Sequence, residues 1–307
     1  MTGAGPRVVA PTFETRYGHT WLTYPDFLPG ADLPGGSCGW SAAGNPDGTE
    51  APDVPGLVLG VAVFRDTSFD SDRRQWLRRA KEALGEGVAA SVPGTCGGTA
   101  GSVGIRPERI IVPWQVHSAE VCDAQAMVER EECDGLVTAR PRVMVGVTVA
   151  DCVPLLAADV EGGVAGAAHC GWRGTAAGIV GNLVDSLNAK VRPGQDGGTA
   201  RYLIGPSIGP CCYEVGEDML SHFSDRDRET CVIRRAGVPG ESQATGEIKT
   251  FFDLKGAVIT RLIDHGVAPG QIYVDNTCTS CQQYQLSSYR AGGRDCGRML
   301  AFVMLTR

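Results

Sequence analysis

The sequence has little of what a membrane protein or a nucleic-acid-binding protein needs. No apolar run approaches the roughly 18 residues that a membrane-spanning helix requires, so no membrane contact is expected. Basic residues are scarce, since 28 Lys and Arg stand against 35 Asp and Glu and the formal net charge is -7. Nucleic-acid binders usually show a basic surface, so nucleic acid is not expected as a partner. Small anionic substrates stay compatible with this composition, because a local cluster of arginines needs no overall excess.

The N-terminus lacks a basic head followed by an apolar stretch, so we expect no secretion signal and a cytoplasmic location. Twelve cysteines are present, and in an intracellular chain of 307 residues they favour reduced thiols over disulfides. A few of these thiols are expected to have metal or catalytic roles, and most are expected to be small buried hydrophobic residues. No protein partner can be inferred from the sequence.

Apolar periodicity predicts helices and strands that interleave along the chain, which indicates a mixed α/β fold. A helix capped by Ser71 is predicted to end before Gly85, and others are predicted after Trp172 and from Asp253. Buried strands are predicted at residues 109–112, 143–149, 153–157, 163–168, 202–204, 271–274 and 299–305. We expect one domain over residues 1–307. Residues 29–56 are rich in Gly, Pro, Ala, Asp and Ser and are predicted to be an insertion or a flexible loop.

The residues that best indicate function are His117, Cys152 and His169. Two imidazoles and one thiolate can hold a zinc ion, and zinc with three protein ligands keeps a fourth position for a water whose pKa it lowers to roughly 7. Cys152 is predicted at the bend between two strands and His169 at a strand-to-helix turn, positions from which a rigid scaffold presents functional groups. A lone histidine or a buried cysteine is more often structural. From the residues alone, a shared metal site and separate structural roles are equal alternatives.

Six segments stand out in the second two thirds of the chain: WQVHS at 114–118, CDGLVT at 133–138, ADCVPLL at 150–156, HCGWRG at 169–174, GPSIGPCCYEV at 205–215, and residues 275–305. They closely resemble the YfiH family, whose members are also labelled laccase-domain proteins or purine nucleoside phosphorylases. Their occurrence in this order makes the resemblance specific. It implies that His117, Cys152 and His169 are zinc ligands. It also implies a β-sandwich core flanked by helices, similar to the catalytic fold of cytotoxic necrotizing factor.

The resemblance implies that the protein cleaves purine nucleosides with phosphate, accepting adenosine, inosine or methylthioadenosine, and that it deaminates adenosine. The N-terminal third departs from the family pattern, which puts the preferred nucleoside in doubt. Copper is the alternative metal, because a two-histidine, one-cysteine set also fits copper. A multicopper oxidase needs a further cluster lined by histidines, and the chain has only five histidines. Laccase chemistry is therefore not expected.

Candidate groups for the substrate are arginines and one carboxylate. The planar guanidinium suits phosphate, and Arg173 ranks first because it lies beside His169 at a predicted helix start. Arg298 ranks second on motif resemblance, followed by Arg16 and Arg290. Asp151, next to Cys152, is predicted to donate or relay a proton to the purine while metal-bound hydroxide or phosphate attacks. An equally good interpretation is that Asp151 orients a histidine ligand.

Two other functions fit the same residues. In the first, Cys152 is a nucleophile and His169 its base in a metal-free hydrolase or amidase. The family resemblance implies a peptidoglycan-precursor editing enzyme as one example. In the second, a fourth side chain closes the metal site of a non-catalytic binding protein. The pair Cys278 and Cys281 has metal-ligand spacing, with Cys211 and Cys212 as the nearest partners. Adjacent cysteines are awkward joint ligands, so ordinary structural roles are favoured there over a second zinc site.

Overall fold

We describe the fold from a computed structural model of the chain. The structure describes residues 5–16, 19–23, 57–64, 73–85, 88–90, 103–105, 107–127, 131–192, 198–236 and 248–306. Within these residues, no helix is long and apolar enough to cross a membrane. The predicted insertion at 29–56 and the predicted helix cap at Ser71 lie outside the described residues.

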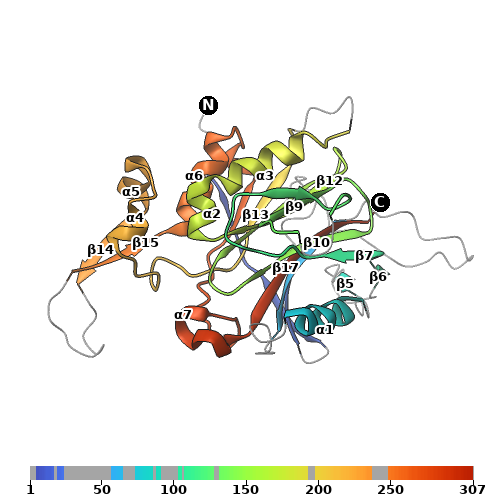
Figure 1. Ribbon diagram of the computed structural model, residues 1–307, viewed down its shortest axis with the longest axis horizontal. Coiled ribbons are helices and arrows are strands. Elements are labelled where there is room, and N and C mark those ends of the chain that lie inside the picture. The colour runs from blue at the N-terminus through green and yellow to red at the C-terminus, as the bar shows by residue number, and fades with distance from the viewer. Residues whose placement is uncertain are drawn as a thin grey trace, which may run out of the picture.

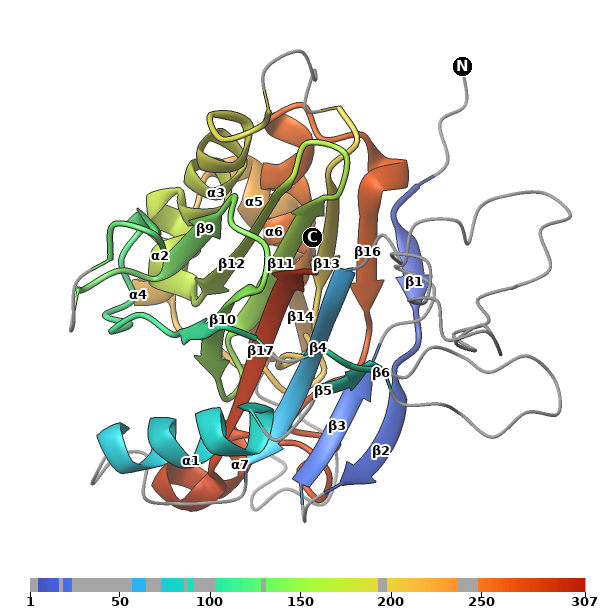
Figure 2. The same ribbon diagram turned by 90° about the vertical axis from the view of Figure 1, so that its right-hand side faces the viewer.

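Two large β-sheets face each other (Figure 2). The seven-stranded sheet runs in the order β1 (Arg7–Val9), β16 (Ile272–Asp275), β13 (Arg201–Ile204), β11 (Val153–Asp159), β12 (Val164–Cys170), β9 (Gly135–Thr138) and β8 (Val121–Asp123). The six-stranded sheet runs in the order β2 (Thr12–Arg16), β3 (His19–Thr23), β4 (Leu57–Phe64), β17 (Arg298–Leu305), β10 (Val143–Val149) and β7 (Arg109–Ile111). Two short hairpins pair β14 (Val232–Ala236) with β15 (Ile248–Phe252), and β5 (Val88–Ala90) with β6 (Val103–Ile105).

Helices cover the outer faces of this sandwich (Figure 1). They are α1 (Arg73–Gly85), α2 (Trp172–Ala177), α3 (Ile179–Asn188), α4 (Glu217–Leu220), α5 (Asp225–Cys231) and α6 (Leu254–Asp264). The short helix α7 (Tyr289–Gly292) lies instead at one end of the sandwich (Figure 2). Side chains alternate across a strand, so neighbouring residues of one strand serve different layers. Leu156 of β11 is buried between the sheets, whereas Leu155 packs in the layer that contains α3 and α6. On the other side, Trp76 of α1 packs against Phe302 of β17. The predicted class, a mixed α/β fold with a β-sandwich core flanked by helices, is confirmed.

The predicted elements recur with two differences. The helix predicted after Trp172 is two helices, because Gly178 has a φ of 101°, a left-handed conformation that ends α2 and begins α3. His169 is not on a turn. It belongs to β12, since the pairing of β11 with β12 continues through Pro154 opposite His169 to Val153 opposite Cys170.

Three of the connections between the two sheets lie at one end of the sandwich, which we call the crossing end. The segments 112–120, 150–152 and 276–297 connect β7 to β8, β10 to β11, and β16 to β17, and each pair of strands lies in different sheets. β7 is parallel to β10, while β13 and β16 run antiparallel to β11, so these strands end where β11 begins. β12 also ends there, since Cys170 lies opposite Val153. Crossing segments from distant parts of the sequence therefore meet at this end.

Candidate metal centre

His117, Cys152 and His169 meet at this end of the sandwich. Their potential ligand atoms all lie within 4.8 Å of one another. His117 comes from the segment between β7 and β8, Cys152 from the turn between β10 and β11, and His169 from the end of β12. The two imidazole rings lie edge to face, with their centroids 4.8 Å apart. The structure thus brings together the three residues that the sequence predicted as a metal-ligand set.

His117 is held by its backbone in an uncommon conformation. Its φ is 62°, which non-glycine residues adopt rarely and which is often kept at functional sites. The Asp134 carboxylate accepts hydrogen bonds from the backbone N–H groups of Val116 and His117, both at 3.0 Å, and of Ser118 at 2.7 Å. Gln115 fixes the same segment to β10, because its side-chain amide bonds both backbone groups of Thr148. Of the three residues of the site, His117 is the exposed one.

His169 is buried and is oriented by the same carboxylate. Its Nδ1 lies 2.7 Å from Oδ1 of Asp134, which is fully buried. Burial opposes the charge of Asp134, but the hydrogen bonds from His169 and the backbone outweigh it and lower the pKa of Asp134 to about 2. A carboxylate at this position accepts a hydrogen bond from the Nδ1–H group of His169. This leaves Nε2 as the nitrogen that can bind a metal. Burial opposes the charged imidazole as well, but the negative Cys152 and Asp134 raise the pKa of His169 to about 9.

The Cys152 thiol is activated by its neighbours. Burial favours the neutral thiol, but the charge of His169 and a hydrogen bond with His117 outweigh it and lower the pKa of Cys152 to about 6. Gly171 leaves the space that the site needs, because a Cβ there would lie 3.0 Å from His117 Cδ2 and 3.2 Å from Cys152 Sγ. By contrast, burial and the charge of Cys152 raise the pKa of the neighbouring Cys170 well above its usual range. Cys152 is therefore the thiolate of this site.

Asp151 occupies the crossing turn with a φ of 85°. Its Oδ1 accepts a hydrogen bond from the Thr279 hydroxyl at 2.6 Å, and its Oδ2 accepts one from the backbone N–H of Arg290 at 2.6 Å. The backbone carbonyl of Asp151 accepts a hydrogen bond from the N–H of Ile208 at 2.9 Å. These bonds tie the residue before Cys152 to two other loops, whereas the carboxylate that contacts a histidine of the site is Asp134. The role of proton donor stays a prediction.

The four arginines predicted to bind phosphate differ in their exposure and in their partners. Arg173 is exposed on α2, and its guanidinium lies 4.3 Å from the centre of the Trp172 ring. The guanidinium of Arg290 donates to the carbonyls of Cys212 and Glu214, both at 3.0 Å. Arg298 donates to the carbonyl of Gly297 at 2.8 Å. Arg16 ends β2, and its side chain lies outside the described part of the structure. Phosphate binding by these arginines stays a prediction.

Sequence reasoning missed two residues of the site. Asp134 lies in a motif that carries the family resemblance, but its role depends on backbone N–H groups that only the fold brings to it. Tyr213 is the second, since burial and the negative charge of Cys152 raise the pKa of its phenol above the usual range. Arg173 and Arg290 act on the same phenol in the opposite direction. A tyrosine two residues after Pro-Cys in the GPSIGPCCYEV motif was the available signal.

The donor set fits a metal ion of the zinc class. Zinc is bound by imidazole nitrogen and thiolate sulfur, and catalytic zinc sites have three protein ligands and one open position. The carboxylate behind His169 is the usual outer support of such a ligand. Copper binds the same donor types, so the ligands alone do not select between the two metals. Within the described residues, the three-ligand group contains no fourth His, Cys, Asp or Glu.

Comparisons with known proteins agree with this arrangement. A family model described as multi-copper polyphenol oxidoreductase laccase matches residues 90–306. The chain is 38% identical to a purine nucleoside phosphorylase of Deinococcus radiodurans, over 63% of this chain and 69% of the relative. It is 30% identical to the adenosine deaminase RL5 of an unknown prokaryotic organism, over 64% of this chain and 75% of the relative.

A solved structure agrees on the fold. YlmD from Geobacillus stearothermophilus superposes with a TM-score of 0.62 and 27% identity, covering 84% of this chain and 95% of that one. The family model matches most of the chain, and the matched range contains the three candidate ligand residues. The chain belongs to the laccase-domain, or YfiH, family.

Proposed function

We propose that the protein is a zinc-dependent purine nucleoside phosphorylase that also deaminates adenosine. Adenosine, inosine and methylthioadenosine are its proposed nucleosides, with phosphate as co-substrate. The observation that carries the proposal is the convergence of His117, Cys152 and His169 within 4.8 Å at the crossing end of the sandwich. The names of the relatives support it, since one is called a purine nucleoside phosphorylase and another an adenosine deaminase.

The three ligands suit a metal that takes part in chemistry. When bound, zinc supplies a Lewis acid with one coordination position open to an oxygen ligand. Asp134 keeps the Nδ1 proton of His169 in place, so that Nε2 stays available and the ring cannot rotate. The bonds of Asp151 to Thr279 and Arg290 fix the turn that presents Cys152. These groups orient the ligands before substrate binds.

In phosphorolysis, a phosphate oxygen forms a bond to C1′ of the ribose while the bond from C1′ to the purine nitrogen breaks. The purine then takes up a proton. We assign phosphate binding to Arg173, with Arg298, Arg16 and Arg290 as further candidates, because a guanidinium pairs with two phosphate oxygens. Tyr213 keeps its proton and is a candidate donor to the substrate. Asp151 is the alternative donor.

The test is an assay for free base released from adenosine or inosine with and without phosphate. The wild type should release base only with phosphate, and Cys152→Ala should lose this activity. Cys231→Ala is the matched control, because Cys231 is buried in the helical layer and belongs to neither candidate metal cluster. Full activity in Cys152→Ala would refute the proposal.

The geometry also favours a second candidate, a thiol hydrolase or amidase. Asp134, His169 and Cys152 form a chain of carboxylate, imidazole and thiol, the arrangement that activates a cysteine nucleophile. Such an enzyme should keep its activity after chelation and lose it to iodoacetamide. The phosphorylase should lose its activity to chelation and recover it when zinc is restored.

A further inference from the structure

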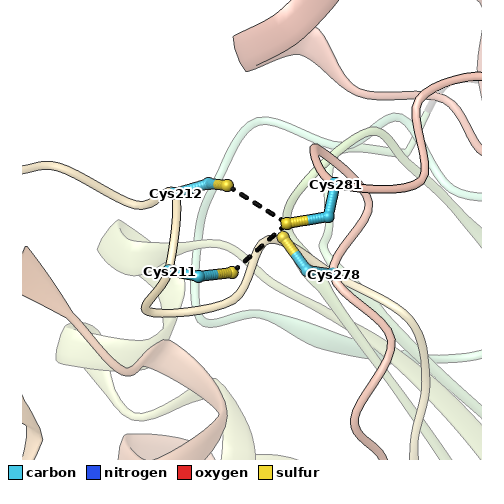
Figure 3. Close-up of side chains that lie close together, drawn as sticks. All are labelled: Cys211, Cys212, Cys278 and Cys281. Atoms are coloured by element: carbon cyan, nitrogen blue, oxygen red, sulfur yellow. Dashed lines mark hydrogen bonds between the residues drawn. The ribbon is translucent and has the colours of Figure 1, made fainter. Parts of the chain in front are cut away.

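Four cysteines form a second cluster, which we call the thiol cluster: Cys211, Cys212, Cys278 and Cys281. All four sulfur atoms lie within 4.8 Å of one another. The Cys281 sulfur is 3.5 Å from that of Cys212 and 3.6 Å from that of Cys211 (Figure 3). Cys278 is buried, Cys212 is half-buried, and the other two are exposed. The cluster therefore lies at the surface and can be reached by an ion.

The backbone explains how adjacent cysteines come to share one point. The N–H groups of Cys212 and Tyr213 both donate to the carbonyl of Gly209 at 3.0 Å, which turns the chain tightly. This turn directs the side chains of Cys211 and Cys212 toward Cys281 (Figure 3). Adjacent cysteines are awkward joint ligands in general, and this turn is what lets both face one point here.

The other half of the cluster is held against this turn by backbone pairing. Cys278 forms an isolated parallel bridge with Ser207, and the N–H of Thr279 donates to the Ser207 carbonyl at 3.1 Å. The N–H of Gly209 lies 3.2 Å from the Cys278 sulfur and donates to it. A Cβ at Gly209 would lie 3.2 Å from Cys211 Sγ and 3.3 Å from Cys278 Cβ, so a glycine is what fits between the two halves.

The sulfur spacing fits one tetrahedral ion. With zinc–sulfur bonds of about 2.3 Å, tetrahedral geometry places the sulfurs about 3.8 Å apart. The two distances of 3.5 and 3.6 Å are close to this value. A disulfide requires about 2.05 Å. The thiol cluster thus has the geometry of a four-thiolate ligand set rather than of two disulfide bonds.

Positive groups surround the thiol cluster. The buried Lys255 ammonium donates to the carbonyls of Asp275 at 2.5 Å and Thr277 at 2.9 Å, immediately before Cys278. The guanidinium of Arg290 donates to the Cys212 carbonyl at 3.0 Å, and that of Arg235 donates to the Cys211 carbonyl. Four thiolates and one divalent cation carry a net charge of about -2, which neighbouring cations stabilise.

We propose that Cys211, Cys212, Cys278 and Cys281 form a second metal site, which binds one zinc-class divalent ion in closed tetrahedral coordination. Binding displaces the thiol protons, which are released to solvent as the four metal–sulfur bonds form. A site saturated by four protein ligands is structural rather than catalytic.

The ion would clamp together two loops that hold the crossing turn of the first site. Ile208, in the loop that carries Cys211 and Cys212, donates to the Asp151 carbonyl. Thr279, between Cys278 and Cys281, donates to its carboxylate at 2.6 Å. The thiol-cluster metal therefore has a positioning role for Asp151 and, through it, for Cys152.

The test is elemental analysis of protein purified without added chelator. The wild type should contain two divalent ions per chain, whereas Cys278→Ser/Cys281→Ser and Cys152→Ala should each contain one. The control Cys231→Ala should contain two. Cobalt substitution of Cys152→Ala provides a measurement in protein whose thiol cluster is intact, and it should give the sulfur-to-metal charge-transfer bands of tetrahedral thiolate coordination.

Three results would overturn the proposal. The first is one ion in the wild type and none in Cys152→Ala. The second is an intact mass lowered by the hydrogens lost when disulfides form. The third is acid-labile sulfide in stoichiometric amount, which would indicate an iron–sulfur cluster. Each is independent of whether the enzyme cleaves nucleosides, so failure here is distinguishable from failure of the proposed function.

Discussion

The two cysteine-containing clusters lie at the same end of the sandwich but differ in what they offer a metal. The first has two imidazoles and one thiol, drawn from three separate segments, and a buried carboxylate behind it. The thiol cluster has four sulfurs, drawn from two loops, and is held mainly by backbone turns and pairing. Three ligands leave an open position, and four close the shell. The number of protein donors thus separates a site suited to chemistry from one suited to holding loops together.

The two clusters also differ in what holds their residues in place. Asp134 is fully buried and accepts four hydrogen bonds from residues 116–118. It also contacts Nδ1 of His169, so one side chain holds two of the three candidate ligand residues, His117 and His169, in place. Among the described residues, no single side chain holds several cysteines of the thiol cluster in the way that Asp134 holds the first site. Asp151 connects the two sites through Thr279 and Ile208.

Chelation should produce the largest difference between the clusters. A brief treatment with a strong chelator should remove the metal from the open three-ligand site first, and phosphorolysis should fall by about 1,000-fold or more, because several kcal/mol of catalysis depend on the metal. The melting temperature should fall mainly on prolonged treatment, when the closed site is emptied. Activity and melting are measured on the same samples over time. Loss of both in a single phase would contradict the assignment of separate roles.

Asp134→Asn should weaken metal binding at the first cluster alone. The amide nitrogen cannot accept the hydrogen bonds that the carboxylate receives, so the orientation of His169 is lost. Loss of such an outer partner costs about 10- to 100-fold in metal affinity. Competition with a metal indicator gives the affinity of each site. Ser118→Ala is the matched control, because it removes one hydroxyl bond to Asp134 and leaves the backbone donors in place. Equal weakening at the thiol cluster would contradict the distinction drawn here.

The sequence predicted where many strands lie but not which of the two sheets each strand joins. The apolar runs 143–149 and 153–157 are buried strands because both of their faces are covered. The bend between them gives no local sign that β10 and β11 belong to different sheets, because that depends on which strands pair with each. The crossing is what places Cys152 at the site.

The same limit explains what was found and missed in the two clusters. His117, Cys152 and His169 were predicted from residue type and family resemblance together. Asp134 was not, because three of its hydrogen bonds come from backbone N–H groups, which look alike in every sequence. The thiol cluster was set aside because Cys211 and Cys212 are adjacent, and only the turn at Gly209 lets both reach Cys281.

Thr279→Val should have a moderate effect that tests the connection between the clusters. It removes the hydroxyl that donates to Asp151 at 2.6 Å. A hydrogen bond to a charged group contributes about 1.5–3 kcal/mol, so kcat/KM should fall by about 10- to 100-fold. Metal content should stay unchanged at both clusters. Thr279→Ser keeps the hydroxyl and should keep most of the activity. If Thr279→Val and Thr279→Ser behave alike, Asp151 does not position Cys152 through this bond.

The smallest expected effect concerns Asp227, which belongs to neither cluster and gives a reference for stability changes that involve no metal. Asp227 pairs with Arg261 at 2.9 Å and caps α5 through Ser224. Burial raises the pKa of Asp227, but the hydrogen bonds from Ser224 and Arg261 outweigh it, so the pKa in the folded state lies below the ordinary value. The unfolded chain then binds more protons than the folded one, and the stabilisation is present above about pH 4 and lost as the pH falls through the folded value.

Asp227→Asn should therefore lower the free energy of unfolding by about 1 kcal/mol at neutral pH, with the difference from wild type shrinking below about pH 4. Urea unfolding at a series of pH values measures it. Asp264→Asn is the control, because Asp264 forms an exposed ion pair with Arg226, and such pairs contribute little. Because Asp227 shares no ligand with either cluster, its effect should add to that of Cys278→Ser/Cys281→Ser. A difference that grows on acidification would show that the carboxylate of Asp227 is not the stabilising form.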